Sequence, residues 1–472
     1  MNPIPRVSGG RVSLLASVAV TVAALLSVPS LTPVSAASDD VVVSAGDVSV
    51  PGNPLARFDI SWIDPNLAEY FLADRSNAAI DIVPLTVNPP VFQIIPTAPN
   101  AFAGVAAGGN NFSGPNGVIT FNDPLSPAGL QLWAGDGPTT NPVCGAMQPC
   151  STVKVITAVS TSSIATSGTA RADELCWAPP VTAFGITVPG TVLIANDADT
   201  PPFDSFIPTD NANGATPNAV SQHVPLTRAT GGIEQCQFDG TVNFTGIPGA
   251  IYQSLPVDGN GPAGVVLVWA RLFPSGLWTI VGTGNPSTAF CVAPQGLAIG
   301  PRGVGGVSID LGDRQILLGC NGSSSTVTVN KFAPGVIINI YLNAGGSDQV
   351  AYTAEAAALH VGHFWTTGST GFPVQQVAQI DPLQSNNTVL NNALDTIVPI
   401  GMPGNSGLSA HSIASWGGVP DGLGLLEAVV VPVPAGGTSS IPFSSTVCGT
   451  NALKGCIAFG VVQPLPAFPD SP

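Results

Sequence analysis

The chain has 472 residues, of which 44% are hydrophobic and only 8% are charged, and its formal net charge is −16. This composition excludes a disordered chain, which needs high charge, while 54 glycines and 46 prolines exclude long helices and coiled coils. Because 12 basic residues face 28 acidic ones, the composition also argues against a nucleic-acid-binding protein. It predicts short strands and frequent turns.

The first 36 residues are typical of a secretory signal peptide. Arg6 and Arg11 supply a basic start, residues 12–28 form an apolar run, and Val34-Ser35-Ala36 matches a small-residue cleavage site. The alternative is a retained anchor helix, although the run is just short of a comfortable membrane span. We expect the mature chain, residues 37–472, to be secreted or held in the cell envelope.

Eight cysteines agree with an oxidising compartment. Three neighbouring pairs are expected from their spacing: Cys144 with Cys150, Cys291 with Cys320, and Cys448 with Cys456. The remaining two, Cys176 and Cys236, either pair or stay as buried thiols. A zinc site is disfavoured because the sequence has no CxxC pair.

A short motif recurs along the chain, in which a turn leads through one or two polar residues into a small apolar run. Its successive copies lie 53 to 63 residues apart. The equivalent positions, near which each repeat begins, are Phe58, Asn116, Asp173, Glu234, Gln295, Asp348 and His411. A period of this length is typical of solenoids and propellers.

Each repeat continues with further strand-like stretches separated by turn residues. The fourth repeat, for example, contains a hairpin of residues 265–272 and 277–282 around Pro274-Ser275-Gly276. We therefore predict an all-β fold, a seven-bladed β-propeller with four-stranded blades that forms a single domain over residues 37–472. The last repeat lacks its outermost strand, so residues 41–50 are expected to supply it and to close the ring.

Residues 70–83, YFLADRSNAAIDIV, resemble the YVTN-type repeat of secreted and surface-layer bacterial propellers. Further copies occur at Trp133–Gly137 with Ser151–Ile156, and at Leu318–Asn321 with Thr326–Val329. The resemblance implies a seven-bladed propeller. It leaves the activity open, because related gluconolactonase-like, NHL-like and strictosidine-synthase-like propellers host binding, scaffolding and hydrolysis on the same frame.

In a propeller the inner strand of each blade starts near one mouth of the central channel, so the seven motifs would place their polar residues in one ring. The members of this ring are Asp59, Asn116, Asp173, Glu174, Glu234, Gln235, Gln295, Asp348, Gln349 and His411. Carboxylates gathered around one axis repel each other, which favours protonation or a bound cation. Oxygen ligands suit Ca²⁺ or another divalent cation. The expected metal ligands are Asp59, Asp173, Glu234 and Asp348. The alternative is an ordinary hydrated channel mouth.

Other polar residues of the ring are expected to contact a ligand. These are Arg75, Asn116, Arg171, Gln235, Gln295 and Gln349. The two arginines would hold a substrate carboxylate, or else pair with Asp74 and Asp173. Trp62 and Trp177 follow inner strands, where packing between blades is favoured over sugar stacking.

Three functions remain open on the sequence. The leading hypothesis is a secreted, monomeric propeller that binds a ligand at the acidic mouth together with a divalent cation, with no organic cofactor and no nucleic-acid partner. The second is a metal-dependent lactonase or esterase in which Glu174, Glu234, Asp348 or His411 moves the proton. The third is a structural protein of the cell envelope.

Overall fold

The computed structural model describes residues 40–85, 90–210, 219–259, 264–286, 289–300, 315–323, 325–342, 346, 348–353, 363–368, 376–380, 394–399, 412–420, 425–435, 448 and 454–464. The predicted signal peptide and His411 lie outside these ranges. Residues 38–472 form one compact unit. No helix in the described ranges is long and apolar enough to cross a membrane.

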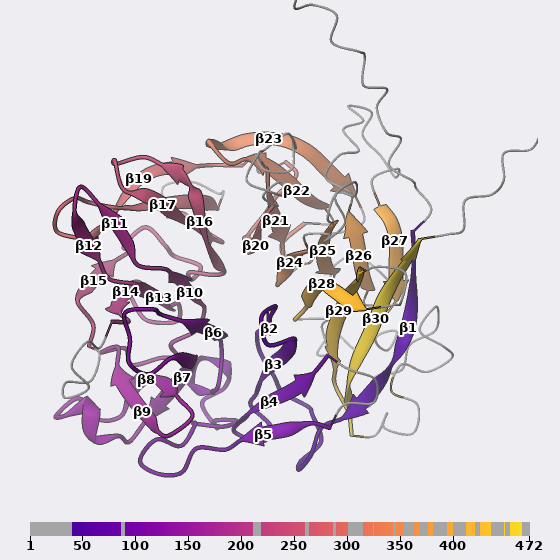
Figure 1. Cartoon of the computed structure of the whole chain (residues 1–472), viewed down its shortest axis with the longest axis horizontal. Coiled ribbons are helices and arrows are strands. Elements are labelled where there is room, and N and C mark those ends of the chain that lie inside the picture. The colour runs from indigo at the N-terminus through magenta and orange to yellow at the C-terminus, as the bar shows by residue number, and fades with distance from the viewer. Residues whose placement is uncertain are drawn as a thin grey trace, which may run out of the picture. The chain divides into compact units, whose positions relative to one another are not determined.

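The described strands pair antiparallel into seven four-stranded sheets and one two-stranded sheet (Figure 1). Sheet 1 contains β2 (Ser61–Asp64), β3 (Glu69–Asp74), β4 (Ala79–Pro84) and β5 (Phe92–Ile94). Sheet 2 contains β6 (Val118–Asn122), β7 (Leu130–Thr139), β8 (Cys150–Ile156) and β9 (Thr161–Ala165). Sheet 3 contains β10 (Leu175–Ala178), β13 (Thr191–Asn196), β14 (Phe203–Pro208) and β15 (Gln222–Pro225). Sheet 4 contains β16 (Cys236–Asn243), β17 (Pro248–Leu255), β18 (Val265–Arg271) and β19 (Trp278–Gly284).

The second half of the chain continues the pattern. Sheet 5 contains β20 (Pro294–Ile299), β21 (Gln315–Cys320), β22 (Ser325–Asn330) and β23 (Ala333–Leu342). Sheet 6 contains β24 (Val350–Thr353), β25 (His363–Gly368), β26 (Gln376–Ile380) and β27 (Leu394–Pro399). Sheet 7 contains β28 (Ala414–Pro420), β29 (Leu425–Val433), β30 (Cys456–Pro464) and β1 (Asp40–Ser49). The prediction of an all-β propeller with four-stranded antiparallel blades is confirmed.

Sheet 7 contains the first described strand, β1, together with the last three, β28 to β30. Strand β1 pairs antiparallel with β30, with Ser49 opposite Cys456 and Asp40 opposite Pro464. Strand β1 therefore forms one edge of sheet 7, and β28 forms the other.

The first strands of successive sheets contact one another: β2 contacts β6, β6 contacts β10, and the series continues through β16, β20 and β24 to β28, which contacts β2. Apolar side chains fill the space between neighbouring sheets. Leu72 of sheet 1, for example, belongs to one buried cluster with Val430 and Ile457 of sheet 7. Middle strands are covered on both faces, which is why β8 is buried along its whole length.

Three smaller elements lie outside the four-stranded sheets. A hairpin of β11 (Val181–Ala183) and β12 (Ile186–Val188) lies between β10 and β13 in the chain. There are also two short 3₁₀ helices. The first, η1 (Asn110–Phe112), lies between β5 of sheet 1 and β6 of sheet 2, and the second, η2 (Pro142–Cys144), lies between β7 and β8.

The four disulfides are Cys144–Cys150, Cys176–Cys236, Cys291–Cys320 and Cys448–Cys456. The three predicted pairs are confirmed. Cys176 and Cys236, which the sequence left open, also pair, and they join β10 of sheet 3 to β16 of sheet 4.

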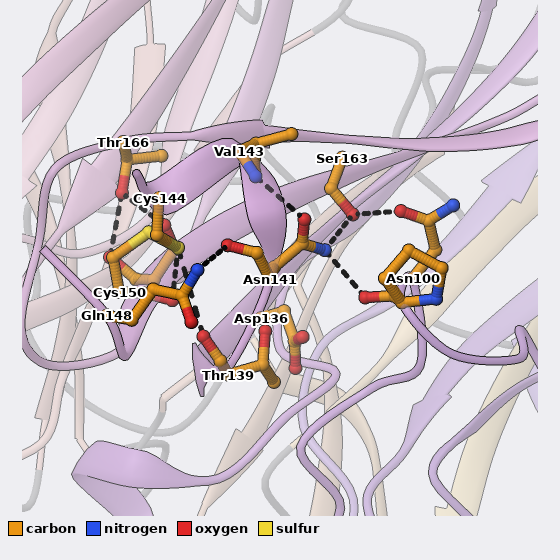
Figure 2. Close-up of a disulfide and its surroundings, with 12 residues drawn as sticks. Asn100, Asp136, Thr139, Asn141, Val143, Cys144, Gln148, Cys150, Ser163 and Thr166 are labelled. Atoms are coloured by element: carbon orange, nitrogen blue, oxygen red, sulfur yellow. Dashed lines mark hydrogen bonds between the residues drawn. A yellow bond between two sulfur atoms is a disulfide. The ribbon is translucent and has the colours of Figure 1, made fainter. Parts of the chain in front are cut away.

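Figure 2 shows how the loop closed by Cys144–Cys150 is held. The side chain of Asn141 accepts a hydrogen bond from the backbone N–H of Val143 and donates to the backbone oxygen of Pro99 at 2.6 Å and to Ser163 Oγ at 3.1 Å (Figure 2). Asn141 thus caps η2 and ties the loop to its own sheet.

Candidate functional site

The polar motif positions have the same backbone arrangement in successive sheets. The N–H of Asp59 donates to Ala73, that of Asp173 to Ala195, and that of Glu234 to Ser254, in each case a carbonyl of the second strand of the same sheet, at 2.8 to 3.0 Å. Each residue therefore precedes its inner strand at an equivalent point. Because the inner strands contact one another, these side chains interact electrostatically across sheets.

We call this set of residues the acidic cluster. It comprises Asp59, Arg75, Asn116, Arg171, Asp173, Glu174, Asp197, Glu234, Gln295 and Asp348, which are linked by the hydrogen bonds, ion pairs and pKa effects described below.

Arg75 is buried in sheet 1, with 2% of its surface exposed, and it neutralises one part of the cluster. Its guanidinium forms an ion pair with Asp59 and donates to Asn116 Oδ1 from Nη2 at 2.7 Å and from Nε at 3.0 Å. Asn116 in turn donates to the backbone oxygen of Ala172 at 2.8 Å. Arg75 thus pairs with Asp59, whereas the sequence offered Asp74, and its contacts connect sheets 1 and 2 to the segment before sheet 3.

Glycine is required directly after Asn116. The N–H of Gly117 donates to the backbone oxygen of Asp173 at 3.1 Å, and a Cβ on Gly117 would lie 2.3 Å from that oxygen. This close approach lets the cluster residues of sheets 2 and 3 lie side by side.

Arg171 neutralises a second part of the cluster. Its Nη2 lies 2.7 Å from Asp173 Oδ2 and 2.8 Å from Asp197 Oδ2, and its Nε donates to Asp197 Oδ1 at 3.1 Å. Burial alone would lower the pKa of Arg171, but the carboxylates of Asp173 and Asp197 raise it well above its usual value. Burial raises the pKa of Asp173 well above its usual value, against the opposing effect of Arg171. Of the two sequence alternatives for Arg171, pairing with Asp173 is the one observed.

Glu234 and Asp348 belong to the part of the cluster that is not fully buried. Gln295 Nε2 donates to Glu234 Oε1 at 3.2 Å, and Asn321 donates to Gln295 Oε1. The pKa of Glu234 is raised well above its usual value, first by burial and then by the neighbouring charges of Asp348 and Asp197. Glu174, which is buried, adds to the same effect. Asn321 is a site residue that sequence reasoning missed, although its place in the Asn321-Gly322 turn was visible.

Gln235 and Gln349 lie deeper in the fold than the expected ligand contacts. Gln349 Oε1 accepts from the N–H of Ile413 at 3.0 Å, and its Nε2 donates to the backbone oxygen of Ser61 at 2.8 Å. Gln235 Oε1 accepts from the N–H of Leu297 at 2.8 Å. Both amides bridge inner strands of different sheets, so they stabilise the fold.

The donor set does not fit a metal site built by the protein alone. Within the described ranges no three His, Cys, Asp or Glu residues are grouped so that they could hold a metal ion. Of the four predicted ligands, Asp59 and Asp173 pair with arginines. The remaining two, Glu234 and Asp348, fall short of the six to eight oxygens that Ca²⁺ takes.

No protein-family model and no curated protein matches this chain. Similar solved structures include virginiamycin B lyase from Staphylococcus aureus, with 10% identity over 89% of this chain and 99% of that chain and a TM-score of 0.48. A streptogramin B lyase shows 9% identity over 90% and 98% of the two chains, with a TM-score of 0.46. A calcium-binding protein from Agrobacterium tumefaciens, regucalcin, shows 10% identity over 89% and 95%, with a TM-score of 0.38. At this level of similarity, no activity of these proteins transfers to this chain.

Proposed function

We propose that this protein is a ligand-binding propeller that takes a positively charged group at Glu234 and Asp348. The observation that carries the proposal is the electrostatic repulsion between these two neighbouring carboxyl groups. The pKa of Glu234 is raised by burial and by Asp348, and both side chains are partly exposed. A cation placed between them would relieve the repulsion and favour the ionised form of both groups.

The proposal includes the closed ring. We place the seven four-stranded sheets as seven blades around one channel, closed by the pairing of β1 with β30. Support comes from the contacts that run from β2 through the other first strands to β28 and back to β2. In this arrangement the acidic cluster encircles one end of the channel.

The cationic group is an ammonium or guanidinium of the ligand, or a divalent cation that the ligand brings with it. Two carboxylates suit an organic cation, whereas a metal ion would need additional oxygens from its ligand. The metal-dependent hydrolase requires a more complete metal site than the described residues offer, so binding is favoured over it. Four disulfides support a location outside the cytoplasm.

The test is thermal unfolding of the mature chain at pH 7.5 with spermidine, with calcium chloride, and with sodium chloride at matched ionic strength. We expect spermidine to raise Tm beyond the salt control, and Glu234→Gln or Asp348→Asn to abolish that increase. Asp210→Asn, which lies outside the acidic cluster, is the matched control and should keep it.

Two results would overturn the proposal. A Tm that responds to no cation would indicate a structural protein. A calcium response that survives both substitutions would place the cation site elsewhere in the chain.

A further inference from the structure

A cavity of about 400 Å³ lies among the inner strands, downstream of the acidic cluster along each of them. Its walls come from β2, β16, β20, β24 and β28. In sheet 1, for example, Asp59 of the cluster precedes β2, whereas Ser61 to Ile63 and Pro65 line the cavity. Because the inner strands start at equivalent points, the cavity and the cluster occupy different levels of the same channel.

Hydrogen-bonded glutamines separate the two levels. Gln349, directly before β24 of sheet 6, bonds to Ser61 of sheet 1, with sheet 7 between them. Gln235, directly before β16 of sheet 4, donates to the backbone oxygen of Val350 of sheet 6 at 3.3 Å, with sheet 5 between them. These bonds link non-neighbouring inner strands, and both glutamines line the end of the cavity that lies next to the acidic cluster.

The cavity walls combine aromatic and aliphatic side chains with uncharged polar ones, including Gln235, Gln237 and Gln349. Trp62, Tyr352 and Trp416 line it together with Ile63, Leu297 and Val350. The part of the lining that the structure describes contains no Asp, Glu, Lys or Arg. This lining disfavours an ion and favours a neutral guest, since an unpaired charge would lose its hydration here.

One wall is held rigidly. Trp62 is 37% exposed, and its Nε1 donates to Thr120 Oγ1 at 3.0 Å, while Thr120 donates to Asp64 at 2.7 Å. The indole is therefore fixed by its neighbouring sheet before any ligand arrives. A fixed aromatic face lowers the entropic cost of binding.

An amide group in the lining supplies polarity. Gln237 is partly exposed and lines the cavity, and its Oε1 accepts a hydrogen bond from the N–H of Ile299 at 2.6 Å. The Nε2 group of the same amide is a donor that a bound molecule with an acceptor can use. Apolar pockets with a few polar groups and volumes of about 300 to 1,000 Å³ are typical small-molecule sites.

We infer that this cavity binds a compact, neutral, aromatic small molecule that carries a hydrogen-bonding polar group. The aromatic body packs against Trp62 and Trp416, and the polar group accepts a hydrogen bond from the side-chain amide of Gln237. This site is separate from the cation site proposed above.

The experiment is a fluorescence titration of the full mature chain with N-phenyl-1-naphthylamine, a neutral aromatic amine whose emission rises in apolar surroundings. We expect saturable binding of one probe per chain. Trp62→Ala should weaken the binding by about tenfold or more, which corresponds to about 1.4 kcal/mol. Ser415→Phe, which fills the cavity, should weaken it as well and provides a second variant if the first unfolds.

Trp177→Ala is the matched control. Trp177 lies on β10, the inner strand of sheet 3, and its Nε1 donates to Thr209 Oγ1 at 3.5 Å, but it does not line the cavity. Its removal, like Glu234→Gln, should change the probe affinity by less than about twofold. The anionic analogue 1-anilinonaphthalene-8-sulfonate should bind at least about tenfold more weakly than the neutral probe.

Three results would overturn the inference. The wild-type chain fails to bind the neutral probe at one site, or the folded variants Trp62→Ala and Ser415→Phe bind it as tightly as the wild type does. The third is that Trp177→Ala loses as much affinity as Trp62→Ala. Equal affinity for the anionic analogue would also contradict a site selective for neutral molecules.

Discussion

The acidic cluster has two parts that differ in how their negative charge is balanced. In the part from sheets 1 to 3, Arg75 pairs with Asp59, and Arg171 pairs with Asp173 and Asp197. In the part from sheets 4 to 6, Glu234 and Asp348 are partly exposed, and the described bond to Glu234 comes from the neutral amide of Gln295.

This difference separates a structural role from a binding role within one ring of similar residues. Buried carboxylates with a fixed arginine hold neighbouring sheets together, and removing one partner leaves an uncompensated charge. Partly exposed carboxylates that repel each other gain from an external cation. Residue type alone does not distinguish the two cases, and three predictions test the distinction.

The largest effect is expected from Arg75→Met. The substitution leaves Asp59 buried without its cation, and we expect the free energy of unfolding to fall by about 3 to 5 kcal/mol in urea titrations. Arg57→Met, at an exposed position near the start of the same sheet, should change it by less than about 0.5 kcal/mol. Equal losses for both variants would contradict a structural role specific to Arg75.

Asp204 tests how burial, rather than a neighbouring charge, changes the pKa of a carboxyl group. It is fully buried, Gln253 donates to its Oδ1 at 2.9 Å, and burial raises its pKa to about 7. A raised pKa means that the folded state binds the proton more tightly. The stabilisation is therefore complete below pH 4 and is lost as the pH rises through about 7.

We expect Asp204→Asn to remove about 2 to 3 kcal/mol of the decline in stability between about pH 5 and pH 8, as measured by urea unfolding across that range. Asp239→Asn is the control. Burial raises the pKa of Asp239, but Lys331 and the hydrogen bonds from Thr241 together outweigh it, so the pKa of this carboxyl is lowered. Its substitution should leave the decline unchanged. If the stability of the Asp204→Asn variant declines with pH as steeply as that of the wild type, the Asp204 carboxyl is not the cause of the decline.

The smallest effect is expected from Glu234→Gln in the absence of ligand. Gln keeps an acceptor for Gln295 and removes the repulsion with Asp348, so stability should rise by at most about 1 kcal/mol at pH 8. Because the pKa of Glu234 is raised, the gain should shrink as the pH falls toward 5 and the native carboxyl takes up its proton. Differential unfolding at the two pH values checks this, and a clear loss of stability at pH 8 would place Glu234 among the structural residues.

The sequence predicted much of the architecture because the relevant signals are local. Alternating apolar runs and turn residues specify strands and hairpins, and neighbouring cysteines such as Cys144 and Cys150 are close whatever the rest of the chain does. The recurring polar residue before each inner strand also located Asp59, Asp173, Glu234 and Asp348. Their types and positions, however, predicted a metal site that the described residues do not form.

The sequence by itself therefore determined the strand repeats, the four-stranded antiparallel sheets and the concentration of carboxylates before the inner strands. Only the tertiary structure decided that Arg75 pairs with Asp59, that Cys176 bonds Cys236, and that Gln235 and Gln349 bridge separate sheets. The reason is physical. Strand formation depends on residues a few positions apart, whereas the balance of charge and the shape of a cavity depend on distances between side chains that are far apart in the chain.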